Sequence, residues 1–566
     1  MAPAPHTLGD DSDADSHSPL LPAPGSTPAP KHHSDTSSTA RSLWYWPVLA
    51  VFGVGIVSAA FWASGVVDVE RGGKKQDPHW PTDIGYAGPT PTGKEAFAAA
   101  TSYPSNYDSS PLNPPSKLET ENFDILHYLG NLAPWRTVNH GLNSTAEIPA
   151  GCEVEQVQLL HRHGARYPTT GAGTESFAKN IVGAPGFEAT GDLSFLNGWK
   201  YKLGGEILVP FGRQQLFNLG VKYRVQYGHL LQEGKKPVFR TESQDRMLKS
   251  ALNFAAGFFG LPFEDQYHQL VTIEWPGFNN TLAPYMTCDN ANRQDMTHGP
   301  KKMAEWAGIY LADALERLKP QVEGVELVTK DLVNMQLMCA YELVALGGSS
   351  FCDLFTEDEW QGFEYYHDLM FFDIFSYGQP SSAASGKGWV QEWLARTLKQ
   401  PLTEFNSTTN SSYHTPEYFP LDQNFVVDAT HDTIISAVIT TLNFSSFARS
   451  GPLPSTHIPT DLSFVTSSIS PFAANLHSQL LSCPSSPLTP KGKEPRFVRW
   501  ILNDGVVPLD NIPGCATNDE GLCHLDAFVA ATQENLKSID WAYDCLADYA
   551  LPPDGVVDGR PPPRRQ

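Results

Sequence analysis

The pattern that most restricts how this chain folds occurs twice: an apolar, strand-like run stops abruptly at a group of charged residues. The first run, "EVEQVQLL", is followed by "HRHGARYP". The second occurs in "NFVVDATHDTIISAVITTL", where the polar break "THD" leads into an apolar, helix-like stretch. Because α/β folds display reactive groups where strands end, the residues at these two breaks are the first candidates for a functional site.

Three other segments have the apolar spacing of amphipathic helices. They are 212–231, 244–260 and 298–319, and Pro320 ends the last of them. A composition of 41% hydrophobic and 11% aromatic residues is that of a globular protein. The length of 566 residues allows a large core and more than one compact unit. The formal net charge of −23 argues against nucleic acid as a partner.

The segments that flank this region differ from it in composition. Residues 1–42 are rich in Pro, Ser, Asp and His, so we expect a disordered tail. Residues 43–67 carry no charge, and this stretch is long enough to cross a bilayer and too long for an ordinary cleaved signal. A buried core helix is the alternative. Residues 68–120 are expected to form a Pro/Gly/Ser-rich stalk, and 554–566 a flexible tail.

Cysteines and sequons favour the secretory pathway. The eight cysteines form an even set without a CxxC pair, which favours disulfides over zinc ribbons. Five glycosylation sequons, N-x-[ST], begin at Asn143, Asn279, Asn406, Asn410 and Asn443. We therefore expect a single-pass type II membrane protein, anchored by residues 43–67 with its N-terminus in the cytosol, whose luminal or extracellular part proteolysis can release. The basic residues near the span mildly favour the opposite orientation.

The first break carries the chemistry of a phosphate site. Arg162 and Arg166 flank His163, and two guanidinium groups so close should lower the pKa of the imidazole and keep a ring nitrogen free to attack. Guanidinium groups also match phosphate oxygens in geometry and charge, and Gly164 would let the backbone approach a ligand. Taken alone, a structural histidine beside two solvated arginines is the simpler interpretation.

The second break supplies a proton donor. Asp432 can protonate a departing alkoxide if its pKa is raised, and His431 can hold the phosphate. An aspartate after a strand is more often a helix N-cap, so this signal is weak by itself.

Together, "RHGARYPT" and "THDT" resemble the histidine acid phosphatase family of the phosphoglycerate-mutase-like superfamily, and in particular its fungal phytase-like members. The segments "FRTESQDRMLKSALNF", "FCDLFTEDEW" and "ILNDGVVPLDNIPGC" extend the resemblance over roughly residues 121–548. The resemblance implies that His163 becomes a phosphohistidine and that Asp432 protonates the leaving group. It also implies four phosphate-binding residues: Arg162, Arg166, Arg246 and His431. No metal or cofactor is required, and His161 is expected to be structural.

The resemblance also implies the fold. We expect a large α/β domain with a mainly parallel sheet plus a smaller α-helical domain, roughly 170–400, within a catalytic domain that spans 121–553 and follows a single transmembrane helix. The active site is expected between the two domains. By the same resemblance the disulfides are Cys152–Cys483, Cys288–Cys545, Cys339–Cys352 and Cys515–Cys523.

The implied function is hydrolysis of phosphomonoesters at acidic pH, with phytate or other phosphomonoesters as substrates. Two departures bear on the substrate: Thr433 stands where fungal phytases typically have asparagine, and "FFDIFSYGQPSSAASGKG" stands where they carry a His/Gly/Asn-rich segment. A basic cradle for a highly phosphorylated inositol is therefore not evident. Lys179, Lys200 and Lys202 could lie at the rim, although lysines are usually solvated surface. Two alternatives are an inactive membrane-tethered relative that binds phosphorylated ligands, and a phosphoglycerate-mutase-type phosphotransferase.

Overall fold

A mixed eight-stranded sheet forms the centre of the computed structural model, which describes residues 123–484, 495–516 and 518–564. Its order is β10-β8-β7-β1-β6-β3-β4, and β9 pairs with β8. The strands are β1 Glu153–Arg162, β3 Val238–Glu242, β4 His268–Thr272, β6 Phe425–Thr430, β7 Asn475–Ser482, β8 Arg496–Leu502, β9 Gly505–Val506 and β10 Cys523–His524. The predicted parallel arrangement holds from β1 through β6 and β3 to β4, whereas the antiparallel strands beyond β1 were not predicted.

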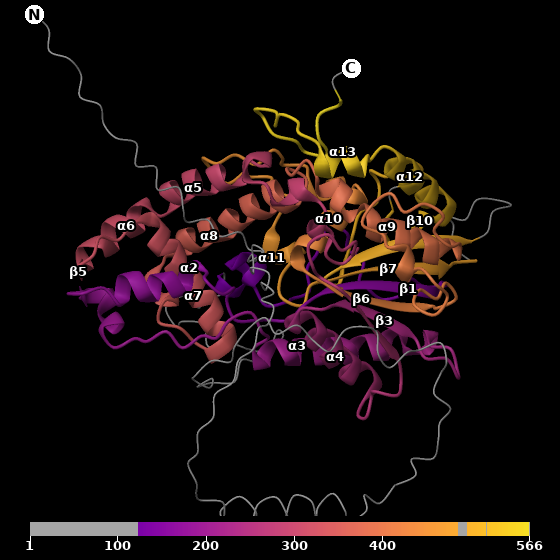
Figure 1. Ribbon diagram of the computed structural model, residues 1–566, viewed down its shortest axis with the longest axis horizontal. Helices are drawn as coiled ribbons and strands as arrows, with labels where there is room; N and C mark the ends of the chain where they lie inside the picture. The colour runs from indigo at the N-terminus through magenta and orange to yellow at the C-terminus, as the bar shows by residue number, and fades with distance from the viewer. Residues whose placement is uncertain (1–122, 485–494, 517, 565–566) are drawn as a thin grey trace, which may run out of the picture. The chain divides into compact units, whose positions relative to one another are not determined.

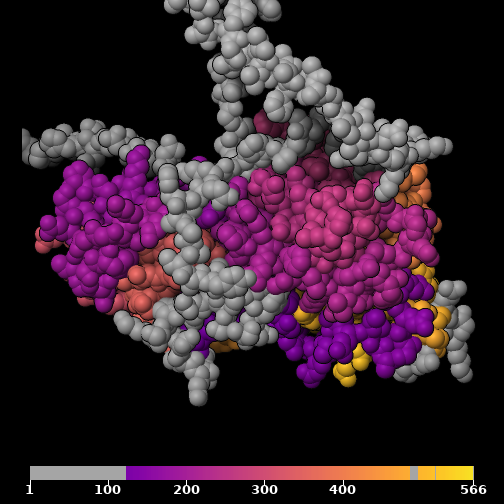
Figure 2. All heavy atoms as spheres, turned by 90° about the horizontal axis from the view of Figure 1, so that it is seen from below, coloured from indigo at the N-terminus to yellow at the C-terminus, as the bar shows by residue number. Residues whose placement is uncertain are grey.

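Helices cover both faces of this sheet (Figure 1). On one face lie α9 Ser382–Leu398, α10 Asp432–Thr441, α12 Leu525–Lys537 and α13 Trp541–Leu546. The other face carries α3 Pro210–Tyr227 and α4 Asp245–Phe259. The helix α3 begins two residues before the predicted segment 212–231, and α4 lies within the predicted segment 244–260. Seen from this side, the magenta residues that include α3 and α4 cover the sheet (Figure 2).

The strand β1 shows why both faces need a cover. Its side chains alternate between the two sides, so Leu160 joins the hydrophobic core under α9 and α10, while Val157 and Leu159 join the core under α3 and α4. A strand buried on both faces reads as a nearly continuous apolar run, which is the pattern of "VQLL".

A second group of helices packs around a hydrophobic core of its own. It comprises α2 Gly173–Phe177, α5 Gly299–Tyr310, α6 Ala312–Leu318, α7 Thr329–Leu346 and α8 Glu357–Met370, with the short strands β2 Glu188–Ala189 and β5 Val322–Glu323 paired beside it. The predicted helix 298–319 is divided at Leu311, although neither proline nor glycine occupies that position. The expected range of the helical domain, 170–400, also contains two strands of the sheet, β3 and β4, and three helices that cover the sheet, α3, α4 and α9.

Four disulfides link the described part of the chain. They are Cys152–Cys483, Cys288–Cys545, Cys339–Cys352 and Cys515–Cys523, the pairs that the family resemblance implied. Two of them connect residues 331 and 257 positions apart in the sequence. Cys152–Cys483 joins the start of β1 to the end of β7, whereas Cys288–Cys545 joins the segment just before the short 3₁₀ helix Asp289–Asn292 to α13.

The expected tail, membrane span and stalk, residues 1–42, 43–67 and 68–120, lie outside the described residues. Of the helices between residues 123 and 564, none combines the length and the apolar character that a membrane crossing needs. Part of the expected C-terminal tail, 554–566, packs against the helix α9. Gly559 accepts a hydrogen bond from the backbone N–H of Ala383, and its own N–H donates to the carbonyl of Tyr377.

Candidate active site

Two adjacent strand ends bring the sequence motifs together. β1 and β6 are parallel neighbours whose last residues, Arg162 and Thr430, are in register. The next residue along β1, His163, donates its backbone N–H to the carbonyl of Thr430 at 3.2 Å. The rings of His163 and His431 lie 5.7 Å apart in an edge-to-face arrangement. The two histidines therefore face one site at the carboxyl edge of the sheet.

The loop after β1 depends on glycine for a different reason than the sequence suggested. A β-carbon on Gly164 would lie 2.1 Å from the carbonyl oxygen of Gly212, and one on Gly212 would lie 2.0 Å from the carbonyl oxygen of Ala165. The close approach that requires glycine here is therefore to the backbone at the start of α3, a packing reason that the sequence did not indicate. This contact anchors the loop that carries His163 to α3.

His163 has one ring nitrogen in use and one free. Its Nδ1 lies 2.8 Å from the carbonyl oxygen of Gly164, and because a carbonyl only accepts, Nδ1 carries the proton and donates it. The lone pair is then on Nε2. Burial lowers the pKa of His163 well below its ordinary value, and the neighbouring guanidinium groups, Arg162 first among them, lower it further. The predicted lowering of the His163 pKa is confirmed, and only the contribution of burial to that lowering was not predicted from the sequence.

Three buried arginines surround this imidazole, since the charges of Arg162, Arg166 and Arg246 all act on it. The guanidinium of Arg162 donates to the carbonyls of Asn131 and Ser470, that of Arg166 donates to the carbonyl of Tyr167, and Arg246 pairs with Glu206 at 2.9 Å. Yet the Nε of all three arginines is buried without a hydrogen-bond partner among the described residues. Buried donors of this kind are costly unless they meet an acceptor, so the cluster is suited to an anion.

Asp432 is held by two of these neighbours. One of its carboxylate oxygens lies 2.7 Å from Nη2 of Arg162 and accepts from the side-chain amide of Asn131 at 2.9 Å. Asp432 is the first residue of α10, and His431 occupies the N-cap position, so the alternative of an N-cap aspartate is not supported. Burial alone would raise the pKa of Asp432, but the Arg162 charge and the Asn131 hydrogen bond lower it. The condition set for a proton donor, a raised pKa, is therefore not met by the protein's own groups.

His431 is enclosed by two carboxyl groups. Its Nε2 lies 2.9 Å from Glu242 and 3.4 Å from Glu274. One possible metal-ligand atom from each of these three residues lies within 4.8 Å of the other two. In the described parts of the chain, this is the one group of three such residues that could suit a metal ion. Hydrogen bonds among them and from Tyr285 to Glu274 already use these atoms. We therefore identify the group as a hydrogen-bonded network and not as metal ligands.

His161 has the structural role expected of it. It is fully buried, its Nδ1 lies 3.1 Å from the carbonyl oxygen of Arg162, and its ring stacks on Phe254. Burial lowers the pKa of His161 to about 4, so the ring is neutral at most pH values. The lysines proposed for the rim are all exposed: Lys179, Lys200 and Lys202.

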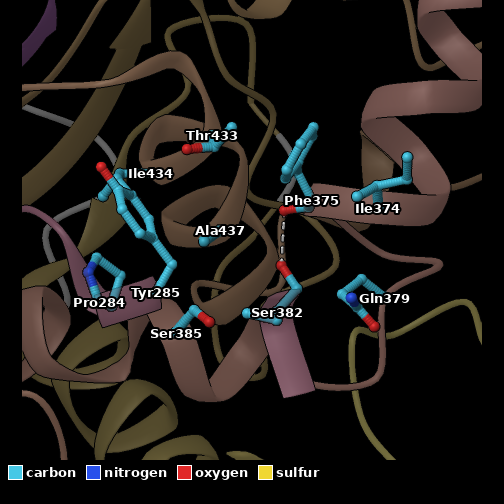
Figure 3. A pocket seen from close by; sticks show the side chains of 11 residues that line it. Pro284, Tyr285, Ile374, Phe375, Gln379, Ser382, Ser385, Thr433, Ile434 and Ala437 are labelled. Atoms are coloured by element: carbon cyan, nitrogen blue, oxygen red, sulfur yellow. Dashed lines mark hydrogen bonds between the residues drawn. The ribbon is translucent and has the colours of Figure 1, made fainter. Parts of the chain in front are cut away.

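A small cavity lies beside the first turn of α10 (Figure 3). Thr433, Ile434 and Ala437 of α10 line it together with Tyr285 and Phe375. Its volume of about 30 Å³ is far below the several hundred that small-molecule pockets typically have. The cavity is therefore not the substrate site, and Thr433 faces this space next to Asp432.

Sequence reasoning missed four polar residues of this site: Asn131, Glu206, Glu242 and Glu274. Asn131 lies in a short 3₁₀ turn, Gly130–Leu132, and nothing in the local sequence marks it. Glu242 is different, because it is the last residue of β3 and thus follows the same strand-end signal as His163. Applied to every strand, that signal would have found it.

Comparison with known proteins agrees with this geometry. Residues 153–503 match the family model described as histidine phosphatase superfamily (branch 2). Phytase A of Aspergillus fumigatus is 30% identical over 435 residues, which cover 74% of this chain and 88% of that protein. Phytase A of Penicillium oxalicum is 30% identical over 442 residues, 74% of this chain and 91% of that protein.

Among solved structures, the phytase from D. castellii superimposes with a TM-score of 0.60 at 24% identity and covers 79% of this chain and 92% of its own. This likeness concerns the fold, and the sequence matches carry the family assignment. The chain belongs to branch 2 of the histidine phosphatase superfamily.

Proposed function

We propose that this protein hydrolyses phosphomonoesters at acidic pH through a phosphohistidine formed on His163. The observation that carries the proposal is the free Nε2 of His163 among three buried arginines whose Nε groups have no partner in the described chain. A phosphate dianion supplies the acceptors and the negative charge that these donors lack. Among the described histidines, His163 is the one that combines a free imidazole nitrogen with this surrounding.

In the first step, the substrate phosphate binds to four residues: Arg162, Arg166, Arg246 and His431. The Nε2 lone pair of His163 attacks phosphorus, the bond to the ester oxygen breaks, and Asp432 gives its proton to the leaving alkoxide. The guanidinium groups stabilise the charge that develops on the equatorial oxygens. In the second step, water attacks phosphorus, the bond from phosphorus to Nε2 of His163 breaks to release inorganic phosphate, and the Asp432 carboxylate takes the proton of that water.

Substrate binding prepares Asp432 for its role. The Arg162 charge lowers its pKa, but a phosphate dianion beside the same guanidinium opposes that effect and favours the protonated carboxyl. A general acid is active only while it is protonated, so the rate falls as pH rises through the pKa of Asp432 in the substrate complex. This gives an acidic pH optimum.

The substrate class is phytase-like: phytate or other organic phosphomonoesters. The sequence relatives named Phytase A support phytate, whereas the exposed positions of Lys179, Lys200 and Lys202 give no buried basic cradle for a highly phosphorylated ring. The test is a panel of phosphomonoesters that includes phytate, glycerol phosphate and nitrophenyl phosphate, assayed from about pH 2.5 to 7.

In this panel we expect His163→Ala to have no measurable turnover on any substrate. The matched control is His140→Ala, because His140 is another histidine with a backbone partner, the carbonyl of Leu502, outside the site. That variant should keep wild-type rates. Turnover by His163→Ala at the control rate would exclude the proposed nucleophile.

We also propose that the catalytic part lies in the secretory lumen or outside the cell, anchored by residues 43–67. Four disulfides and five sequons support this, and all five sequon asparagines are exposed or half-buried. Protein from a eukaryotic host should gain gel mobility after endoglycosidase treatment and resist extraction by alkaline carbonate. An unglycosylated, extractable product would exclude this topology.

A further inference from the structure

Two buried carboxyl groups meet at the ring of His431, outside the residues to which the mechanism gives a role. Glu242 ends β3, and Glu274 follows the end of β4, its parallel neighbour, so both side chains reach the same edge of the sheet. Both lie within hydrogen-bond range of one atom, Nε2 of His431, at 2.9 and 3.4 Å. Glu242, Glu274 and His431 have exposed fractions of 0%, 7% and 4%.

The two carboxyl groups differ in their donors. Glu274 accepts a hydrogen bond from the hydroxyl of Tyr285 at 2.6 Å and another from the side-chain amide of Gln244. Apart from His431, Glu242 has the hydroxyl of Thr430 at a long 3.4 Å, and that hydroxyl donates to the carbonyl of Leu282 at 2.8 Å. Donors stabilise a carboxylate, and two adjacent buried carboxyl groups resist joint ionisation. Glu274 is therefore the ionised member, and Glu242 carries the proton.

The directions of the pKa shifts agree with this assignment. Burial raises the pKa of Glu242 well above its ordinary value. Burial also acts on Glu274, but the His431 charge and the hydrogen bonds to His431 outweigh it and lower that pKa to about 2. Burial opposes the charged form of His431, and the two carboxyl groups raise its pKa to about 9.

His431 then has a proton on each nitrogen. Nε2–H donates to the carboxyl pair, and Nδ1 has no hydrogen bond with any described residue. The other charged groups that act here are Arg246, which stabilises the Glu274 carboxylate, and Asp432. With the ring of His163 at 5.7 Å, Nδ1–H is the remaining donor of His431 for a phosphate oxygen.

We propose that Glu242 and Glu274 are positioning residues that keep His431 charged and oriented toward the phosphate, with Glu274 as the ionised partner and Glu242 as the neutral one. This inference rests on the phosphate site of the proposed function. Its consequence is that the site keeps its fourth positive charge at pH values where an ordinary histidine, with a pKa of about 6.5, is neutral.

Sulfate is the probe of choice because it remains a tetrahedral dianion from pH 5 to 8, so any change in its affinity comes from the protein. The Kd of sulfate is measured by calorimetry on the full-length protein at pH 5 and at pH 8. If Glu274→Gln returns the pKa of His431 from about 9 to about 6.5, the Kd at pH 8 rises by up to about 30-fold relative to wild type, whereas the Kd at pH 5, where His431 is protonated in both proteins, hardly changes.

Glu242→Gln separates the two carboxyl roles. If Glu242 is neutral, its amide replacement changes no charge, and the Kd rises by a similar small factor at both pH values. Glu274→Asp keeps the charge and should restore part of the pH 8 affinity. The matched control is Glu342→Gln, a buried glutamate bonded to Trp199 and Ser349 outside the site, which should bind sulfate as wild type does.

A pH 8 loss in Glu242→Gln and not in Glu274→Gln would overturn the assignment. If one variant fails to fold, the other still tests it: a loss specific to pH 8 in Glu242→Gln, or no such loss in Glu274→Gln, contradicts the assignment. Unchanged pH dependence in both variants would exclude the positioning role while the wild type still hydrolyses monoesters. A wild type that neither binds sulfate nor hydrolyses monoesters would instead exclude the proposed function. If chelation abolishes sulfate binding and zinc restores it, the group holds a metal, and the proposal fails.

Discussion

In the proposed mechanism, His163 and Asp432 reach their reactive states by different routes. His163 is reactive as it stands, because burial and three guanidinium groups keep its imidazole neutral and the Gly164 carbonyl fixes the proton on Nδ1. Asp432 must be protonated to act as a donor, but Arg162 and Asn131 stabilise its carboxylate form. In the proposed mechanism it becomes a proton donor when the substrate brings negative charge next to Arg162.

The donor role of Asp432 can be separated from a purely electrostatic one by the choice of leaving group. An alkoxide from glycerol phosphate needs a proton in the transition state, whereas nitrophenolate leaves without one. Asp432→Asn should therefore lower kcat on glycerol phosphate by about 10²- to 10⁴-fold and far less on nitrophenyl phosphate. A burst experiment first establishes that phosphorylation limits the rate. Equal losses on the two substrates would mean that the proton comes from another group.

At the scale of elements, the site depends on the order of parallel strands. β1 and β6 place their motifs side by side, and β3 and β4 add Glu242 and Glu274 at the same edge. A buried ion network lies behind this edge. Asp428 of β6 accepts from Arg240 of β3 at 2.6 and 2.7 Å, from Arg396 of α9 at 2.8 Å and from Trp389 at 2.9 Å.

This network ties three elements together, so its loss should be costly. Asp428→Asn leaves two buried guanidinium groups without their main partner and should lower the free energy of unfolding by about 3–5 kcal/mol in urea titrations. The control is Glu155→Gln, whose ion pair with Arg496 is 40% and 37% exposed and should contribute less than about 1 kcal/mol. Equal effects of the two substitutions would contradict the importance of burial.

The contribution of Asp428 to the stability of the fold depends on pH in a definite direction. Burial would raise the pKa of Asp428, but Arg240 and Arg396 lower it to about 2, below the ordinary value of about 3.9. A lowered carboxyl pKa stabilises the fold fully above the unfolded value, and that stabilisation is lost as pH falls through about 2. The difference in the free energy of unfolding between wild type and Asp428→Asn should therefore persist at pH 5 and shrink between about pH 4 and 2.

Strand-end signals and the family resemblance predicted much of this arrangement. The approach of His163 to His431 follows from two apolar runs that end in reactive residues. Asn131 and the role of Gly164 could not be predicted, because each depends on a contact between segments far apart in the chain. The lowered pKa of Asp432 was missed for the same reason: Asn131 and Arg162 reach it from other elements.

For the whole molecule, disulfides connect distant parts of the chain. Cys152–Cys483 closes a separation of 331 residues and Cys515–Cys523 one of only 8. In the loop-entropy model the longer link restricts the unfolded chain more, by about 3 kcal/mol between these two lengths. Removal of the first pair by double alanine substitution should therefore lower the free energy of unfolding more than removal of the second. An equal or smaller loss would contradict the model.

Chemical trapping of the enzyme intermediate shows directly whether His163 is the nucleophile. Full-length wild-type protein is mixed rapidly with a radiolabelled phosphomonoester, quenched, and analysed for protein-bound phosphate. The account predicts an adduct that acid removes and base does not, located on the peptide that contains His163 and absent from His163→Ala. A serine or aspartyl phosphate, or the same adduct in His163→Ala, would contradict it.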